Sequence, residues 1–121
     1  MADYTADELR EALRPIASLI GKSEKARQRL RPGTWQRRML DENLRALHLA
    51  TDLMAGKPGE GPAFSRGDLE AALRALSAMI GKAENAQAKF APGTAQHTLQ
   101  RNRIRALRIA EARVRAELGE G

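Results

Sequence analysis

Four arginines near the end of the chain form its most suggestive set of chemically active side chains. They follow one another at helical spacing and share one stripe of the predicted last helix: Arg101, Arg105, Arg108 and Arg115. Arg103 and Arg113 are expected to add charge on the opposite flank of that helix. Guanidinium groups one turn apart suit phosphates or carboxylates, because each presents a planar fork of donors. The stripe therefore predicts a face for an anionic partner, and the alternative interpretation is a solvated face of an arginine-rich chain.

Other reactive patterns are incomplete. The run Gly21-Lys22-Ser23 is the ending of a phosphate-binding loop, but position 16 is Ile where that loop needs glycine. The chain has no cysteine, and its two histidines, His48 and His97, lack the Glu-x-x-His spacing of bundle metal sites. We therefore expect no metal, no cofactor and no enzymatic activity.

An internal repeat defines the elements that position these residues. From Leu9 to Ala50, 17 of 42 positions are identical to the residues sixty positions later. The sequence thus predicts an internal duplication. We expect one helical domain over residues 1–121, with a helical hairpin at 4–55, a Gly/Pro linker at 56–63 and a second hairpin at 64–118.

Helix signals recur in both halves. Thr5 and Glu8 have the spacing of a capping box, and Tyr4 with Leu9 that of a hydrophobic staple; Phe64, Ser65, Asp68 and Leu69 repeat both. Pro32 and Gly33 predict a turn, so the first helix should end near Arg31 and the second should begin after Thr34. Apolar residues at helical spacing give each predicted helix one seam: Leu9, Leu13, Ile16, Ile20 and Leu30; Leu40, Leu44, Leu47 and Met54; Leu69, Leu73, Leu76, Ile80 and Phe90; Ile104, Leu107 and Val114.

These patterns predict an all-α fold, a four-helix bundle formed by two antiparallel helical hairpins. The alternative is a domain swap, in which the hairpins separate and pair with another molecule. Polar residues on the seams leave a further question open. Glu111 is expected either to face Arg27 or Gln87 across the bundle or to lie near a solvated end.

Two further features allow two interpretations each. Ala17 with Gly21, and Ser77 with Gly81, make a notch of small residues on each half, which indicates either a close helix crossing or slight kink inside the bundle, or a docking groove. Trp35 corresponds to Ala95 in the repeat, so the fold does not require an indole there. Trp35 is expected to pack over a bundle end or to anchor a partner.

Composition limits the function without deciding it. The net charge is +6, divided as +2 in residues 1–60 and +4 in residues 61–121, which permits an anionic partner but does not require one. No segment is apolar enough to span a membrane and the start has no signal-peptide pattern, so we expect a cytoplasmic protein. The main hypothesis is a non-enzymatic interaction module that presents a helical face to a protein partner or to itself. Nucleic-acid binding through the arginine stripe is the alternative, and the oligomeric state stays open.

Overall fold

The chain folds as two helical hairpins. A computed structural model describes residues 4–56 and 63–119, and within them the ordered elements are the helices α1 (Ala6–Gln28), α2 (Trp35–Ala55), α3 (Arg66–Gln87) and α4 (Ala95–Glu117). The described residues contain no strand, so the all-α prediction is confirmed. The predicted linker at 56–63 lies, apart from its two end residues, outside the described residues.

The predicted caps form at both hairpin starts, with one difference. The Glu8 amide donates to Thr5 Oγ1 over 3.1 Å, and the Thr5 amide donates to Glu8 Oε1 over 3.0 Å, so the capping box is complete. The Asp68 amide donates to Ser65 Oγ over 3.0 Å, but these two described residues form no return bond. The shorter Asp side chain accounts for this difference, because capping boxes use Glu or Gln for the return contact.

The turn between α1 and α2 has the predicted residues in the predicted roles. Gly33 has a φ of 88°, in the left-handed region that favours glycine, and the Thr34 hydroxyl caps α2 by accepting from the Arg37 amide. α1 ends slightly before the expected position, at Gln28. Its last turn tightens there, since the Arg29 and Leu30 amides bond to carbonyls three residues back.

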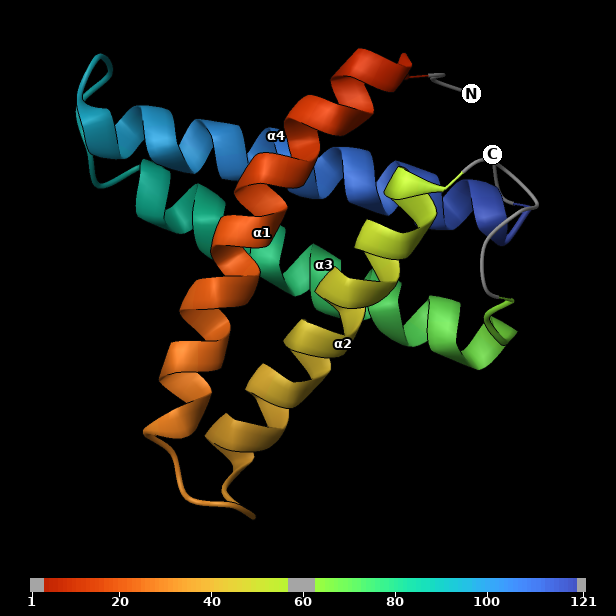
Figure 1. Cartoon of the computed structure of the whole chain (residues 1–121). Coiled ribbons are helices and arrows are strands. Elements are labelled where there is room, and N and C mark those ends of the chain that lie inside the picture. The colour runs from red at the N-terminus through yellow and green to blue at the C-terminus, as the bar shows by residue number, and fades with distance from the viewer. Residues whose placement is uncertain (1–3, 57–62, 120–121) are drawn as a thin grey trace.

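The two hairpins stack as two layers that cross each other (Figure 1). α1 contacts α2 and α4, while α2 also contacts α3 and α4. The seams meet in one core whose largest fully buried side chains are Ile16, Leu47, Leu76, Leu107 and Val114. Tyr4 and Phe64 pack against that core as the staples predict. Each hairpin thus buries its apolar stripe against the other, which is where most helix stability in proteins originates.

The crossing leaves the turn end of each hairpin without a neighbour (Figure 1). Three large apolar side chains are exposed near these ends: Trp35 at 62%, Leu99 at 45% and Phe90 at 38%. The prediction that Phe90 belongs to the buried seam is therefore wrong. Its helix face is apolar, but the other hairpin does not reach it.

The expected contact of Glu111 across the bundle is also wrong. Glu111 pairs with Arg115 of the same helix at 4.0 Å, whereas Arg27 pairs with Asp41 of α2. The Arg27–Asp41 ion pair therefore joins the two helices of the first hairpin to each other and not to the second hairpin.

Candidate functional site

The small-residue notches lie on the outside of the molecule. Ala17, Gly21 and Ser77 are exposed and Gly81 is half-buried, and a Cβ atom added at either glycine would meet nothing within 4 Å. The interpretation as a close helix crossing is therefore wrong. In the described residues no Cα atom of α1 lies within 8 Å of a Cα atom of α3, so the two notches do not join into one groove. A docking role for each notch stays a prediction.

The arginine stripe of α4 is exposed as predicted, but most of it is paired with carboxylates. Arg108 Nη2 lies 2.9 Å from Glu84 of α3, and Arg105 Nη2 lies 3.8 Å from Glu8 of α1. Arg115 lies 4.0 Å from Glu111. These exposed pairs contribute little to stability, yet an incoming anion must compete with a carboxylate already in place. Among the described residues, Arg101 is the stripe member for which no ion pair is found.

The two arginines expected on the opposite flank of α4 do not add surface charge. Arg103 is 9% exposed, and its Nε has no hydrogen-bond partner among the described residues. The Arg113 side chain is 14% exposed and pairs with Glu117 at 3.1 Å.

A groove between α2 and α3 has a volume of about 660 Å³. Its floor is built mainly from alanines of the two helices, with Leu49, Met39 and Phe64 beside them. Its rim is polar and of mixed charge. The residues that line the groove are Met39, Glu42, Asn43, Arg45, Ala46, His48, Leu49, Asp52, Phe64, Asp68, Ala71, Ala72, Arg74, Ala75 and Ala78.

A smaller hollow of about 340 Å³ lies between α1 and α4 and corresponds to this groove residue by residue. Each of its nine lining residues stands sixty positions away from a lining residue of the α2–α3 groove. Two substitutions narrow it, since Glu11 and Pro15 occupy the places of Ala71 and Ala75.

An ion pair also spans the smaller hollow. Arg105 reaches Glu8 across it, whereas no ion pair between Arg45 and Asp68, the corresponding residues of the α2–α3 groove, is found in the described part of the chain. The α2–α3 groove is thus the open member of a matched pair.

The lining of the groove combines apolar and polar side chains. An apolar floor with a few polar groups at the rim is the usual composition of a docking site. His48 and Asp52 stand one turn apart on α2, but no group of three or more metal-ligating side chains is found within residues 4–56 and 63–119. Binding by shape and burial is what this arrangement supports best.

The turn between α1 and α2 carries a charge concentration that the sequence interpretation missed. Residues 22–38 contain seven basic and one acidic side chain, a net charge of +6, whereas residues 82–98 contain two basic and one acidic. We call residues 22–38 the basic tip. Summing charge over whole halves hides it, since most acidic residues of the first half lie elsewhere. A comparison of matched windows in the two repeats would have found it.

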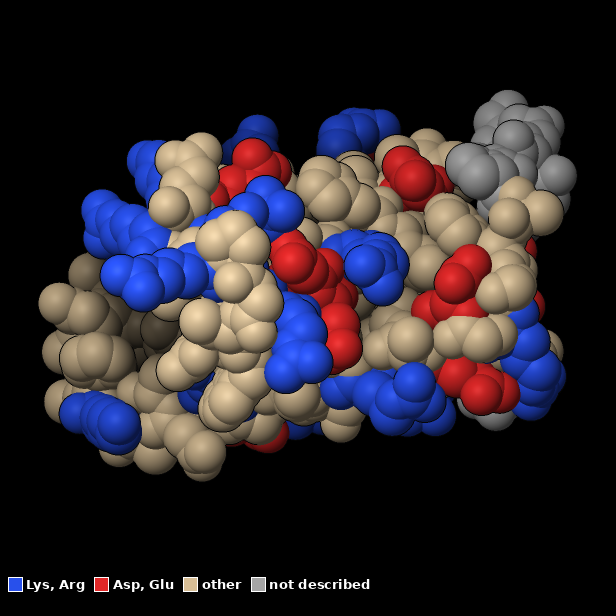
Figure 2. All heavy atoms as spheres, turned by 90° about the horizontal axis from the view of Figure 1, so that it is seen from below, with Lys and Arg blue, Asp and Glu red and all other residues tan. Residues whose placement is uncertain are grey.

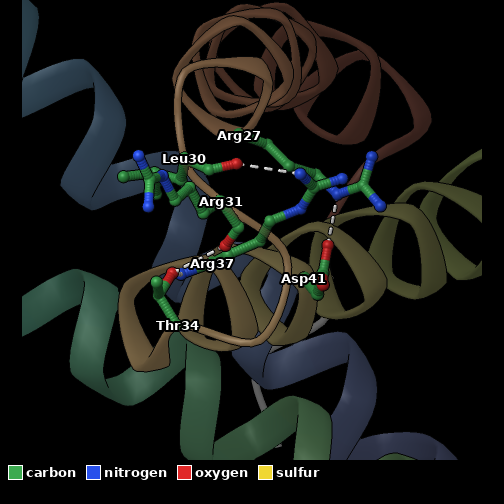
Figure 3. A network of polar contacts seen from close by, with 6 residues as sticks. All are labelled: Arg27, Leu30, Arg31, Thr34, Arg37 and Asp41. Carbon is green, nitrogen blue, oxygen red and sulfur yellow. Dashed lines mark hydrogen bonds and ion pairs between the residues drawn. The ribbon is translucent and has the colours of Figure 1, made fainter.

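Polar contacts hold the basic tip in one shape (Figure 3). Arg37 Nη1 donates to the Leu30 carbonyl over 2.9 Å, and the Thr34 hydroxyl donates to the Arg31 carbonyl over 2.9 Å. The ion pair between Arg27 and Asp41 joins α1 to α2 beside them. Trp35 stands on this end, and its 62% exposure contradicts the expectation that it covers a bundle end.

Comparisons with known proteins assign no relatives. No family model, no curated protein and no solved structure matches this chain. No helix in the described ranges has the length and hydropathy of a membrane span. The surfaces described above are therefore the basis for any functional proposal.

Proposed function

We propose that the protein is a non-enzymatic interaction module whose α2–α3 groove binds an amphipathic helix of a partner protein. The observation that carries the proposal is the contrast between two matching hollows. Side chains of α1 and α4 fill much of the α1–α4 hollow, whereas alanines leave the α2–α3 groove open. A helix pair with small residues along its junction allows a third helix to approach closely and bury an apolar stripe.

The length of the groove supports a helix as its occupant. Its lining runs along α2 from Met39 to Asp52, which at 1.5 Å per residue spans about 20 Å. That length corresponds to between three and four helical turns and exceeds most small metabolites. An occupant with apolar residues at i, i+3, i+4 and i+7 would cover the floor.

The rim charges support a protein partner rather than a polyanion. The charged lining residues are Glu42, Asp52 and Asp68 together with Arg45 and Arg74. A nucleic acid would meet three carboxylates here, whereas a protein helix with both signs of charge can match them. Self-association through the same groove is the competing form of this proposal.

The proposal includes an origin by internal duplication. The correspondence of nine lining positions between the two hollows supports it, as does the repeat in the sequence. After duplication, one groove was filled and the other stayed open for a partner. A cytoplasmic location belongs to the same proposal and is supported by the absence of cysteine.

The second candidate function is nucleic-acid binding through the α4 stripe. It is supported by the exposure of Arg101, Arg105, Arg108 and Arg115. It is weakened by the carboxylates that already contact Arg105, Arg108 and Arg115. We therefore place it after the protein-partner proposal.

Peptide display tests the groove. We would select binders from a library of amphipathic helices about 15 residues long, which matches the groove. Ala71→Trp should fill the groove and weaken the selected peptides at least tenfold. Glu11→Trp places the same side chain at the matching position of the α1–α4 hollow and should leave affinity unchanged. Failure to enrich any helix, or equal losses in both variants, would refute the proposal. Dimerisation of the wild type that Ala71→Trp abolishes would replace the partner with a second copy.

A further inference from the structure

The basic tip is a concentration of positive charge, and it projects beyond the other hairpin (Figure 1). Its net charge of +6 equals that of the whole chain, although it contains only residues 22–38. Figure 2 looks at the molecule from this side, and Lys and Arg side chains surround the projecting turn. None of its residues lines the α2–α3 groove, so the tip is a separate surface.

Most of these cations have no partner within the described protein. Arg27 pairs with Asp41 and Arg37 donates to a carbonyl, so both serve the turn itself. No hydrogen bond or ion pair with another described residue is found for the remaining side chains, which are exposed: Lys22, Lys25, Arg29, Arg31 and Arg38. Five such cations between residues 22 and 38 repel one another, a cost that an anionic partner removes.

Helix stability explains only part of this charge. Lys25 and Arg27 lie in the last turn of α1, where cations interact favourably with the helix dipole. Arg37 and Arg38 lie in the first turn of α2, where the dipole favours anions, and this turn has no acidic residue. Arg37 is accounted for by its bond to the Leu30 carbonyl, whereas Arg38 opposes the local helix field and requires another explanation.

The chain's single tryptophan stands among these cations. Trp35 is the first residue of α2 and is 62% exposed. Arg38 follows three residues later and so lies on the same helix face. An exposed indole beside guanidinium groups provides a stacking surface for an unpaired base next to donors for its phosphates.

We propose that the basic tip binds single-stranded nucleic acid, with phosphates on its five solvent-facing cations and a base stacked on Trp35. The partner is single-stranded because a paired base has no free face for the indole. An anionic membrane is a poorer match, since Trp35 and Pro32 are the exposed apolar residues of the tip apart from small ones. This site differs from the α4 stripe in both residues and location.

The intrinsic fluorescence of Trp35 reports binding directly, because the chain has no other tryptophan. We would titrate the protein with a twelve-nucleotide oligouridylate and follow the emission. Stacking should quench it. If the five solvent-facing cations each neutralise a phosphate, the log–log salt slope should be about −3.5, so affinity should fall roughly 100-fold between 50 and 200 mM salt.

Variants that copy residues of the second hairpin localise the site. Arg31→Ala combined with Arg38→Thr introduces the residues found at 91 and 98, and should reduce the salt slope to about −2. Trp35→Ala introduces the residue found at 95 and should weaken binding about 5- to 150-fold in an assay with a labelled oligonucleotide. Arg101→Ala combined with Arg105→Ala removes the same charge from α4 and serves as the control.

Each outcome either supports or overturns the proposed site, and circular dichroism should first confirm that each variant folds. Loss in the tip variants but not in the α4 control supports the site. Equal losses in both would show a delocalised charge effect and overturn it. Absence of binding, or affinity independent of salt, would also overturn it. Binding to phosphatidylserine vesicles without binding to the oligonucleotide would overturn it as well and assign the tip to membranes.

Discussion

The two hairpin turns have the same backbone and different surfaces. Gly33 and Gly93 have φ values of 88° and 90°, and the Thr34 and Thr94 hydroxyls donate to the carbonyls three residues back over 2.9 Å and 2.8 Å. Around this common frame, residues 22–38 carry a net charge of +6 and residues 82–98 carry +1. The residues that the two turns share set their backbone conformation, and the residues that differ set their surface charge.

The α2–α3 and α1–α4 hollows show the same division. Ala12 and Ala72, and Ala46 and Ala106, keep the matching floors, whereas the residues at 11 and 71 set how much space is left above them. From this comparison we expect the same substitution at two matching positions to have equal effects where the hairpins share a feature. Where the hairpins differ, we expect the effects to differ.

The largest effect is expected in the core. Leu47→Ala and Leu107→Ala each truncate a fully buried leucine at matching positions. Each should lower the free energy of unfolding by about 2–5 kcal/mol, because transfer and cavity terms add. Urea denaturation of both variants should give values within about 1 kcal/mol of each other. If one hairpin tolerated the truncation, the cores would not be equivalent.

The next effect concerns the turns. Gly33→Ala and Gly93→Ala should each destabilise by about 1–2 kcal/mol, because both positions require positive φ. Gly21→Ala is the matched control in a helix interior with open space, and should stabilise by about 1 kcal/mol. Thermal melts of the turn variants and of the control should therefore move in opposite directions. A stabilised Gly33→Ala variant would contradict the turn assignment.

A smaller effect distinguishes the hairpins. Arg27 and Asp41 form an ion pair whose side chains are 42% and 35% exposed, while the matching residues are Gln87 and Arg101. A double-mutant cycle to alanine should give a coupling of about 0.2–1 kcal/mol for the first pair and none for the second. Equal coupling in both hairpins would remove this distinction.

The smallest effect depends on pH. Hydrogen bonds from the Thr5 backbone and then the Thr5 side chain hold the pKa of Glu8 below its ordinary value of 4.5. A lowered folded-state pKa gives stability that is present above pH 4.5 and lost as pH falls through the folded-state value. Glu8→Gln keeps a capping acceptor without titrating. The melting-temperature advantage of the wild type over Glu8→Gln should therefore shrink below pH 4.5; an advantage that grew in acid would contradict the assignment.

Local signals in the sequence predicted the helices well. The capping box at Thr5, the turn at Gly33 and the buried seam through Ile16 and Leu47 all depend on residues close in the chain, and all are confirmed. The crossing of the hairpins depends on how two finished surfaces fit, which no local pattern encodes. For that reason the prediction of a buried Phe90 is wrong.

The candidate sites were harder to predict from the sequence than the helices, because they also depend on how the helices pack. The helical spacing correctly predicts that the α4 arginines are exposed. Their carboxylate partners Glu8 and Glu84 belong to other helices, so these ion pairs are visible only in the fold. From the sequence alone, a mid-helix glycine such as Gly21 indicates a close helix crossing. In the fold, however, a Cβ atom at Gly21 would meet nothing within 4 Å. The α2–α3 groove joins residues from both repeats, and only packing brings them together.

The most direct test of a helix-binding groove is a chemical-shift map of the isotopically labelled protein with the best peptide from the helix library. The proposal predicts that amide shifts concentrate along the α2–α3 groove, at Ala71, Ala75 and Leu49, while the amides of Glu11 and Ile109 at matching positions stay unchanged. Shifts confined to the α1–α4 hollow or to the turns would contradict it.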